Sequence, residues 1–206
     1  FHIPSGSMKS NLLIGDYLFV SKYSYGFSRY SMPFAPPLFE GRIMEGDEKP
    51  KRGEVIVFKL PGDTGTNYIK RLVGLPGDTV QVKDGVLYIN GVSVSKKYKD
   101  IFIDDNGSEI PRYTETLPNG TRYDVLDEKQ NGMVDNTSVY TVPEGHYFFM
   151  GDNRDNSTDS RFITDVGFVP HDHLVGRAEI IIWPEGFSKF WKLYKKINNN
   201  ELTRNN

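Results

Sequence analysis

Two short segments carry side chains that could act as a nucleophile and its base. Ser7 lies in the glycine-containing run 4–8 (PSGSM), and Lys70 lies in the largely apolar run 68–73 (YIKRLV). A serine hydroxyl becomes a nucleophile when a nearby base removes its proton. None of the four histidines lies in a recognisable nucleophile motif. The pair therefore predicts a hydrolase in which Ser7 attacks a carbonyl and Lys70 is the base.

A lysine base has to be neutral when the substrate arrives, whereas a free lysine has a pKa of about 10.4. Burial among apolar side chains lowers the pKa, and a value of about 8 corresponds to a bias of about 3 kcal/mol against the charged form. In a strand, Lys70 shares one face with Tyr68 and Leu72. The local sequence thus predicts a buried Lys70 with a lowered pKa.

The composition excludes several other kinds of function. The chain has 206 residues, a net charge of −2 and no cysteine. Thiol catalysis and thiolate metal sites are excluded, and a general nucleic-acid binder would be basic. A neutral lysine needs no cofactor, so none is expected. No run of about 18 apolar residues is present, and the start at Phe1 rather than Met leads us to expect that a segment upstream of the serine motif has been removed.

The remaining pattern predicts an all-β fold. Short β-branched and aromatic runs occur at 16–20, 54–58, 67–73, 79–83, 86–89 and 146–150. Asp84-Gly85 and Asn90-Gly91 have the residue types of two-residue hairpin turns, and residues 75–78 (LPGD) fit a turn with glycine at its third position. We therefore expect mostly antiparallel sheets that are connected by hairpins.

The domain organisation is expected to be discontinuous. Residues 1–22, 52–95 and 145–197 would form a catalytic β core, residues 23–51 a projecting extended ribbon, and residues 96–144 a β-rich inserted subdomain. A short C-terminal helix is expected to present aromatic residues on one face with lysines around it: Phe187, Phe190, Trp191 and Tyr194. This face could contact a membrane interface or pack onto the domain, and the sequence leaves both alternatives open.

Five segments, in order, resemble the motif series of bacterial type I signal peptidases: 4–8, 13–16 (LIGD), 52–58 (RGEVIVF), 68–78 (YIKRLVGLPGD) and 151–161 (GDNRDNSTDSR). The resemblance implies the signal-peptidase/repressor-protease-like fold and a membrane-anchored serine endopeptidase. It implies a catalytic domain on the outer face of the cytoplasmic membrane, next to the lipid surface. The partners would be signal peptides of exported preproteins, which the family cleaves after a small residue.

The resemblance also implies roles for individual residues. The backbone N–H of Ser7 and the hydroxyl of Ser5 would stabilise the oxyanion, and Ser157 would orient Lys70. Two structural ion pairs, Arg71 with Asp152 and Asp159 with Arg161, would hold the site. Apolar residues at matching places would form shallow substrate pockets: Phe1, Ile3, Pro4, Met8, Leu12, Leu18, Val57, Tyr68 and Ile69.

Other interpretations were weighed against this one. His171 and His173 on one side of a strand could hold zinc, but no third ligand is evident, and a surface loop is favoured. Asp152 and Asp155 are poor candidates for cation ligands because arginines surround them, so no metal is expected. Another Ser/Lys processing protease of the same fold and a non-catalytic scaffold homologue are the two alternative functions.

The chain departs from the family pattern at two places. Ser10 stands where the family commonly has a proline, and Asn67 stands where an acidic residue is often found. These differences are expected to change the edges of the substrate pockets rather than the Ser7 and Lys70 pair.

Overall fold

The computed structural model describes residues 5–14, 17–22, 24–31, 42–46, 48–129 and 132–182. Nearly all regular structure within these ranges is antiparallel β-sheet, which confirms the predicted fold class. Three short 3₁₀ helices are the other regular elements of the described chain: η1 (Gly6–Met8), η2 (Arg29–Ser31) and η3 (His171–His173). The predicted C-terminal helix at 187–197 lies outside the described residues.

The largest sheet has six strands, and one of its inner strands carries Lys70. Its strands are, in spatial order, β1 (Tyr17–Ser21), β15 (Leu174–Ile182), β4 (Val55–Leu60), β5 (Asp63–Gly74), β13 (His146–Met150) and β14 (Val169–Pro170). β5 is the long central strand, and it pairs with β4 on one side and β13 on the other. A residue in the C-terminal half of β5 is therefore enclosed by strands on both sides.

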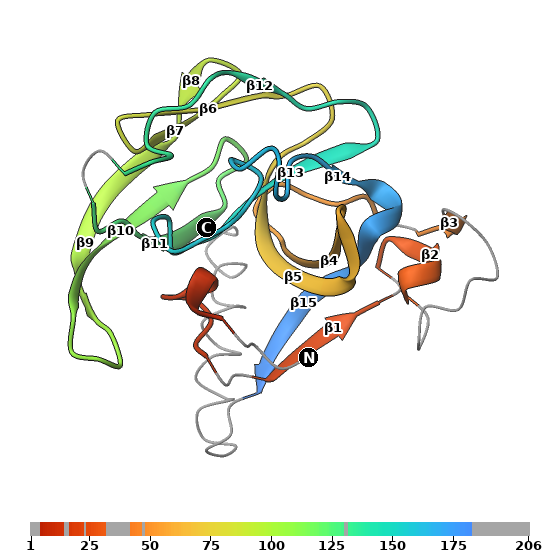
Figure 1. Ribbon diagram of the computed structural model, residues 1–206, viewed down its shortest axis with the longest axis horizontal. Coiled ribbons are helices and arrows are strands. Elements are labelled where there is room, and N and C mark those ends of the chain that lie inside the picture. The colour runs from red at the N-terminus through yellow and green to blue at the C-terminus, as the bar shows by residue number, and fades with distance from the viewer. Residues whose placement is uncertain are drawn as a thin grey trace, which may run out of the picture.

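Three smaller sheets surround the six-stranded sheet (Figure 1). One contains β12 (Tyr140–Thr141), β6 (Thr79–Lys83), β7 (Val86–Ile89) and β8 (Val92–Ser93). Another contains β11 (Arg122–Leu126), β10 (Glu109–Thr116) and β9 (Ser95–Ile103), and the last pairs β2 (Gly26–Ser28) with β3 (Arg42–Glu45).

The predicted tight turns have the backbone angles that their residue types favour. Asp84 and Gly85 have φ values of 49° and 70°, and Asn90 and Gly91 have 53° and 76°. Two successive positive φ angles match the right-handed twist of the flanking strands in a hairpin. The turn at 75–78 closes with a 3.0 Å bond from Asp78 N to Leu75 O, and Gly77 has a φ of 83°. Local sequence chemistry therefore sets the connections along the chain from β5 to β8.

Two buried clusters form most of the core. One packs Phe58 and Phe149 as stacked rings, with centroids 4.5 Å apart, beside Leu72 of β5. The other joins residues of β6, β7 and β13 to the 96–144 region through Leu117, Tyr123 and Val125. The region predicted as an insert is thus β-rich and shares a hydrophobic core with neighbouring strands. Its division from the core as a subdomain stays a prediction, as does the projecting ribbon at 23–51.

Candidate active site

The Ser7 hydroxyl lies in a one-turn 3₁₀ helix, η1, that follows an extended Ser5. Lys9 N donates to Gly6 O at 3.1 Å, and Leu12 N donates to Met8 O at 2.9 Å, so backbone bonds close the turn. Asn153 holds the same turn from the other side: its backbone N donates to Ser7 O at 3.0 Å and its Nδ2 donates to Gly6 O at 3.1 Å. The carbonyl groups around the nucleophile are therefore fixed by the 151–161 loop.

Lys70 meets Ser7 from the centre of β5. Its Nζ donates to Ser7 Oγ at 2.6 Å, and the residue is only 4% exposed. Tyr68 lies on the same strand with its ring centroid 5.1 Å from Nζ. Burial lowers the pKa of Lys70 to about 8, although the charges of Asp159 and Asp152 act in the opposite direction. A substantial fraction of Lys70 is therefore neutral at mildly alkaline pH and can accept a proton.

The other two predicted catalytic serines lie close by. Ser5 Oγ is 3.3 Å from Ser7 Oγ. The Ser157 hydroxyl is buried and close enough to Asp159 to help lower the pKa of that carboxyl, but no contact has regular hydrogen-bond geometry. No hydrogen bond between Ser157 and Lys70 occurs within the described residues.

Gly151 explains how Ser157 approaches the nucleophile. A Cβ atom at position 151 would lie 2.1 Å from Ser157 Oγ and 2.7 Å from Ser7 O. Both distances are shorter than a van der Waals contact, so a side chain at this position would displace one of the two serines. The glycine therefore permits the loop and the nucleophile turn to pack directly against each other.

Two buried arginine–carboxylate pairs lie beside the site. Arg71 donates to Asp152 from Nε at 2.8 Å and from Nη2 at 2.6 Å. Arg161 donates from Nε and Nη2 to the two oxygens of Asp159 at 2.8 and 2.9 Å. Burial alone would raise the pKa of Asp159, but Arg161 and the Gly151 N–H keep it below its usual value. All four side chains are at least nine-tenths buried and form rigid charge pairs.

The residues predicted to line substrate pockets fall into three groups. Met8, Leu12, Leu18 and Ile69 pack in one apolar cluster next to the nucleophile turn. Val57 is buried on β4, and Tyr68 packs against Phe58. The remaining predicted pocket residues lie outside the described part of the chain: Phe1, Ile3 and Pro4. Contact of these positions with substrate stays a prediction.

Two asparagines hold the site and were not singled out in the sequence. Asn11 Nδ2 donates to Asp152 Oδ2 and to Asp124 O, both at 2.7 Å. Asn153 binds the nucleophile turn as described above. Asn153 lies inside the 151–161 motif, and that position was its only sequence signal. Asn11 lies between the motifs at 4–8 and 13–16 and had no such signal.

The two histidines considered for zinc lie in η3 rather than in a strand, so the strand placement is wrong. Pro170 precedes the turn, and a 3₁₀ turn directs residues two apart to different sides. His171 Nδ1 lies 3.1 Å from the Tyr147 hydroxyl, whereas His173 Nδ1 lies 3.1 Å from Lys59 O. The two imidazoles therefore bond to separate partners.

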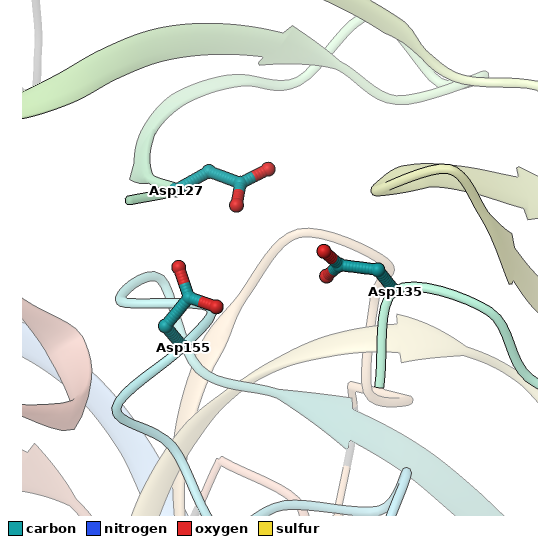
Figure 2. A group of neighbouring side chains, drawn as sticks. All are labelled: Asp127, Asp135 and Asp155. Atoms are coloured by element: carbon teal, nitrogen blue, oxygen red, sulfur yellow. The ribbon is translucent and has the colours of Figure 1, made fainter. Parts of the chain in front are cut away.

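Three carboxylates meet elsewhere: Asp127, Asp135 and Asp155 each place an oxygen within 4.8 Å of the others (Figure 2). Protein donors already bind one oxygen of each group. Lys96 binds Asp127, the Gly132 N–H binds Asp135, and two backbone N–H groups bind Asp155. Asp152, the other acid once weighed as a ligand, is paired with Arg71 instead. We assign no metal to either group.

No helix in the described residues combines the length and the apolar character needed to cross a membrane.

Comparison with known proteins identifies the family. The family model described as "Signal peptidase, peptidase S26" matches residues 1–183. "Signal peptidase I" of Rickettsia typhi is 44% identical over 189 residues, which cover 88% of this chain and 70% of that protein. The protein of the same name from Rickettsia canadensis is 43% identical over 192 residues, with the same coverage.

A crystal structure of a signal peptidase I from Enterococcus faecalis V583 is 34% identical and covers 64% of this chain and 98% of its own, with a TM-score of 0.39. The family match spans the serine turn, the lysine strand and the 151–161 loop. By this match the chain belongs to the signal peptidase family, peptidase S26.

Proposed function

We propose that Ser7 and Lys70 are the catalytic dyad of this signal peptidase, a serine peptidase that removes signal peptides from preproteins. The observation that carries the proposal is the 2.6 Å contact between Lys70 Nζ and Ser7 Oγ in a buried setting. Burial lowers the pKa of Lys70 to about 8, so the amine can act as a base at a moderate pH.

The reaction follows from these two groups. Neutral Lys70 takes the proton of Ser7 while Oγ attacks the scissile carbonyl carbon, and the resulting ammonium returns a proton to the leaving amine. This first half-reaction gives an acyl-enzyme on Ser7 and releases the amine product. Lys70 then removes a proton from water, the hydroxide attacks the ester, and Ser7 regains its proton as the acid is released.

Ser5 and the Ser7 N–H are the proposed oxyanion donors. Ser5 Oγ lies 3.3 Å from Ser7 Oγ, so its hydroxyl is beside the atom that forms the new bond. One preorganised donor contributes about a hundredfold or more in rate. Ser157 makes no hydrogen bond to Lys70 among the described residues, so its proposed role in orienting Lys70 rests on the family resemblance, and no metal or cofactor is proposed.

Specificity is proposed to come from the apolar cluster beside the nucleophile turn. Met8, Leu12 and Leu18 are each at most 5% exposed, so only a small part of their apolar surface is open to a substrate side chain. An extended substrate would lie along the two motif segments with main-chain hydrogen bonds, and alternate side chains would enter shallow pockets. We therefore propose cleavage after a small residue, with a second small residue two positions earlier.

We propose that the catalytic domain works at the outer surface of the cytoplasmic membrane. Ile14 and Phe19, which flank the start of β1, are 51% and 60% exposed and are suited to contact lipid. The net charge of −2 gives no support to binding of nucleic acid. The partners in this proposal are signal peptides and the lipid surface.

The test is cleavage of a preprotein with an Ala-x-Ala junction in lipid vesicles. The parent, Ser7→Ala and Lys70→Met are compared with the matched variants Ser95→Ala and Lys97→Met, which change exposed residues of β9. We expect one cut at the junction, full activity in both matched variants, and a loss of about 1,000-fold or more in the other two. Below pH 8 the parent rate should fall about tenfold per pH unit, because only neutral Lys70 is active.

Three results would contradict the proposal. Activity of Lys70→Met close to that of the parent would remove Lys70 as the base. A cleavage rate that does not change between pH 6 and 8 would also remove Lys70 as the base. A folded parent without cleavage activity would favour a non-catalytic scaffold function.

A further inference from the structure

Arg154 is a buried cation of the 151–161 loop whose charge partner lies outside every motif. Its Nη1 and Nη2 donate to Oε1 and Oε2 of Glu115 at 2.7 and 2.6 Å. Glu115 is near the end of β10 and its side chain is 0% exposed, while that of Arg154 is 4% exposed. A bidentate pair of this kind has a defined geometry as well as a favourable energy. The sheet of β9, β10 and β11 is therefore fixed to the loop that carries Ser157.

Tyr123 extends the contact from Glu115 to the neighbour of Lys70. Its hydroxyl donates to Glu115 Oε2 at 2.7 Å, and its ring lies under the Arg71 guanidinium with 4.2 Å between the ring centroid and Cζ. Arg71 directly follows Lys70 on β5 and is paired with Asp152. Glu115 thus contacts the loop through Arg154 and the lysine strand through Tyr123.

Arg154 in turn holds both ends of the loop. Its Nε donates to Gly151 O at 3.1 Å, and its carbonyl accepts from Arg161 Nη2 at 2.6 Å. Arg161 is paired with Asp159, which also accepts from Gly151 N at 2.9 Å. Movement of Arg154 would therefore move Gly151, whose lack of a side chain leaves room for Ser7 and Ser157.

We propose that Glu115 is a positioning residue for the Ser7–Lys70 site, acting through Arg154 and Tyr123. The proposal rests on the dyad proposed above as the reacting pair. Glu115 does not touch Ser7 or Lys70, so its effect is on their placement and on the charge around them.

The charge balance around the loop supports this role. Three arginines (Arg71, Arg154 and Arg161) face three carboxylates, namely Glu115, Asp152 and Asp159. Burial alone would raise the pKa of Glu115, but Arg154 and the Tyr123 hydroxyl outweigh burial, and Lys96 acts in the same direction. Glu115 is therefore ionised, and its loss leaves one net positive charge in the group.

That added positive charge bears on Lys70. The charged groups that affect Lys70 are Asp159 and Asp152, which favour its protonated form, and Arg161, which disfavours it. Ser7 and the Tyr68 ring are its neutral neighbours. An uncompensated cation in the adjacent loop would disfavour protonation further. Glu115→Gln is therefore expected to lower the pKa of Lys70.

The experiment compares Glu115→Gln with Glu109→Gln, which changes an exposed glutamate at the start of the same strand. Two readouts are taken on the full chain in vesicles: kcat and KM for an Ala-x-Ala preprotein from pH 6 to 10, and the pKa of Lys70 by NMR of its side-chain Cε. For Glu115→Gln we expect kcat to fall roughly tenfold or more and KM to stay within about twofold of the parent value. We also expect the acid limb of the pH–rate profile and the pKa of Lys70 to lie about half a pH unit below their parent values.

The outcomes separate this proposal from the proposed function. Parent-like kcat and an unmoved Lys70 pKa in folded Glu115→Gln would overturn the positioning role, whatever the parent does. If kcat falls only as much as the fraction of folded protein and the acid limb of the pH–rate profile does not move, Glu115 has a purely structural role. That result would also overturn the positioning role. A parent that does not cleave would refute the proposed function alone, and the NMR titration would still decide whether Glu115 affects Lys70.

Two further variants keep the test valid if Glu115→Gln does not fold. Glu115→Asp keeps the charge but is one methylene shorter, so we expect a parent-like acid limb with a reduced kcat. Tyr123→Phe removes the hydrogen bond to Glu115 without a change of charge, and we expect a several-fold fall in kcat. Parent-like kcat in both folded variants would overturn the positioning role.

Discussion

Lys70 and Arg71 are adjacent on β5 and both are buried cations, yet their surroundings differ. Arg71 forms two hydrogen bonds with Asp152 and stacks on Tyr123. Lys70 donates to a neutral hydroxyl, and in the described part of the chain no carboxylate forms an ion pair with it. Successive residues of a strand point to opposite faces, so one face carries a compensated charge and the other an uncompensated one.

The difference shows how one strand can serve two purposes. A buried cation with a carboxylate partner stays charged and holds its neighbours in place. A buried cation without such a partner loses its proton easily, and burial lowers the pKa of Lys70 to about 8. The 151–161 loop supplies the pairing on the Arg71 side, and the Ser7 turn supplies a proton donor on the Lys70 side.

The largest expected effect comes from making Lys70 permanently charged. Lys70→Arg keeps a cation but cannot lose its proton near neutral pH. We expect cleavage to fall by about 1,000-fold or more, measured as kcat/KM with the Ala-x-Ala preprotein. Lys97→Arg on the exposed part of β9 is the matched control and should keep full activity. Substantial cleavage by Lys70→Arg would mean that another group is the base.

The next effect removes the partner of Arg71. Asp152→Asn leaves a buried arginine without a carboxylate and is expected to lower the free energy of unfolding by about 3 kcal/mol. Urea denaturation of the parent and the variant measures the change. Asp100→Asn breaks the more exposed pair with Arg112 and should leave the midpoint close to that of the parent. If Asp152→Asn and Asp100→Asn lower the free energy of unfolding equally, burial does not account for a difference between the two ion pairs.

An effect of similar size and opposite sign is expected from Lys70→Met. Below pH 8 the parent carries a charged lysine in a buried site, so the variant should be about 3 kcal/mol more stable. Between the folded pKa of about 8 and the unfolded pKa of 10.5, the native state has already lost the proton that the unfolded chain still binds, and parent stability rises with pH.

The gain of Lys70→Met should therefore shrink over this range and vanish above it. Denaturant unfolding at pH 7 and at pH 10.5 measures the change, with Lys97→Met as the exposed control. A gain in stability that is the same at both pH values would rule out titration of Lys70 as its cause.

The smallest effect concerns Lys9, which joins the nucleophile turn to Asp104 and Asp105 at the end of the β9–β10 hairpin. Asp105 is 79% exposed, so solvent screens its contact with Lys9, whereas the Lys9 and Asp104 side chains are 8% and 19% exposed. Lys9→Met is expected to cost less than about 1 kcal/mol of stability, with a smaller effect in high salt. Thermal unfolding at low and high salt checks this, and a loss as large as that of Asp152→Asn would place Lys9 among the buried pairs.

Strand positions and turns were predictable because their causes are local. The runs 79–83, 86–89 and 146–150 are strands with those bounds, and the two hairpin turns have the positive φ values that Asp, Asn and Gly allow. The segment 171–173 was placed in a strand as one alternative, and this failed because Pro170 and the packing of two histidines on separate partners favour a 3₁₀ turn.

Pairs that are distant in sequence were harder to predict. Arg154 has several acidic residues near it in sequence, yet its partner is Glu115, 39 residues away on another sheet. Asn11 binds Asp152 across 141 residues. From the sequence alone, any carboxylate could be the partner of Arg154. Packing decides which carboxylate lies within hydrogen-bond distance once water is excluded.

The sequence by itself determined the β-rich fold, the tight turns and the segments that carry the serine, the lysine and the 151–161 loop, because residue type and short-range spacing decide these features. Only the tertiary structure decided that Lys70 reaches Ser7 at 2.6 Å with no carboxylate partner among the described residues, while Arg71 beside it has one. Burial and distance produce that difference, and both depend on how separate strands and loops pack together.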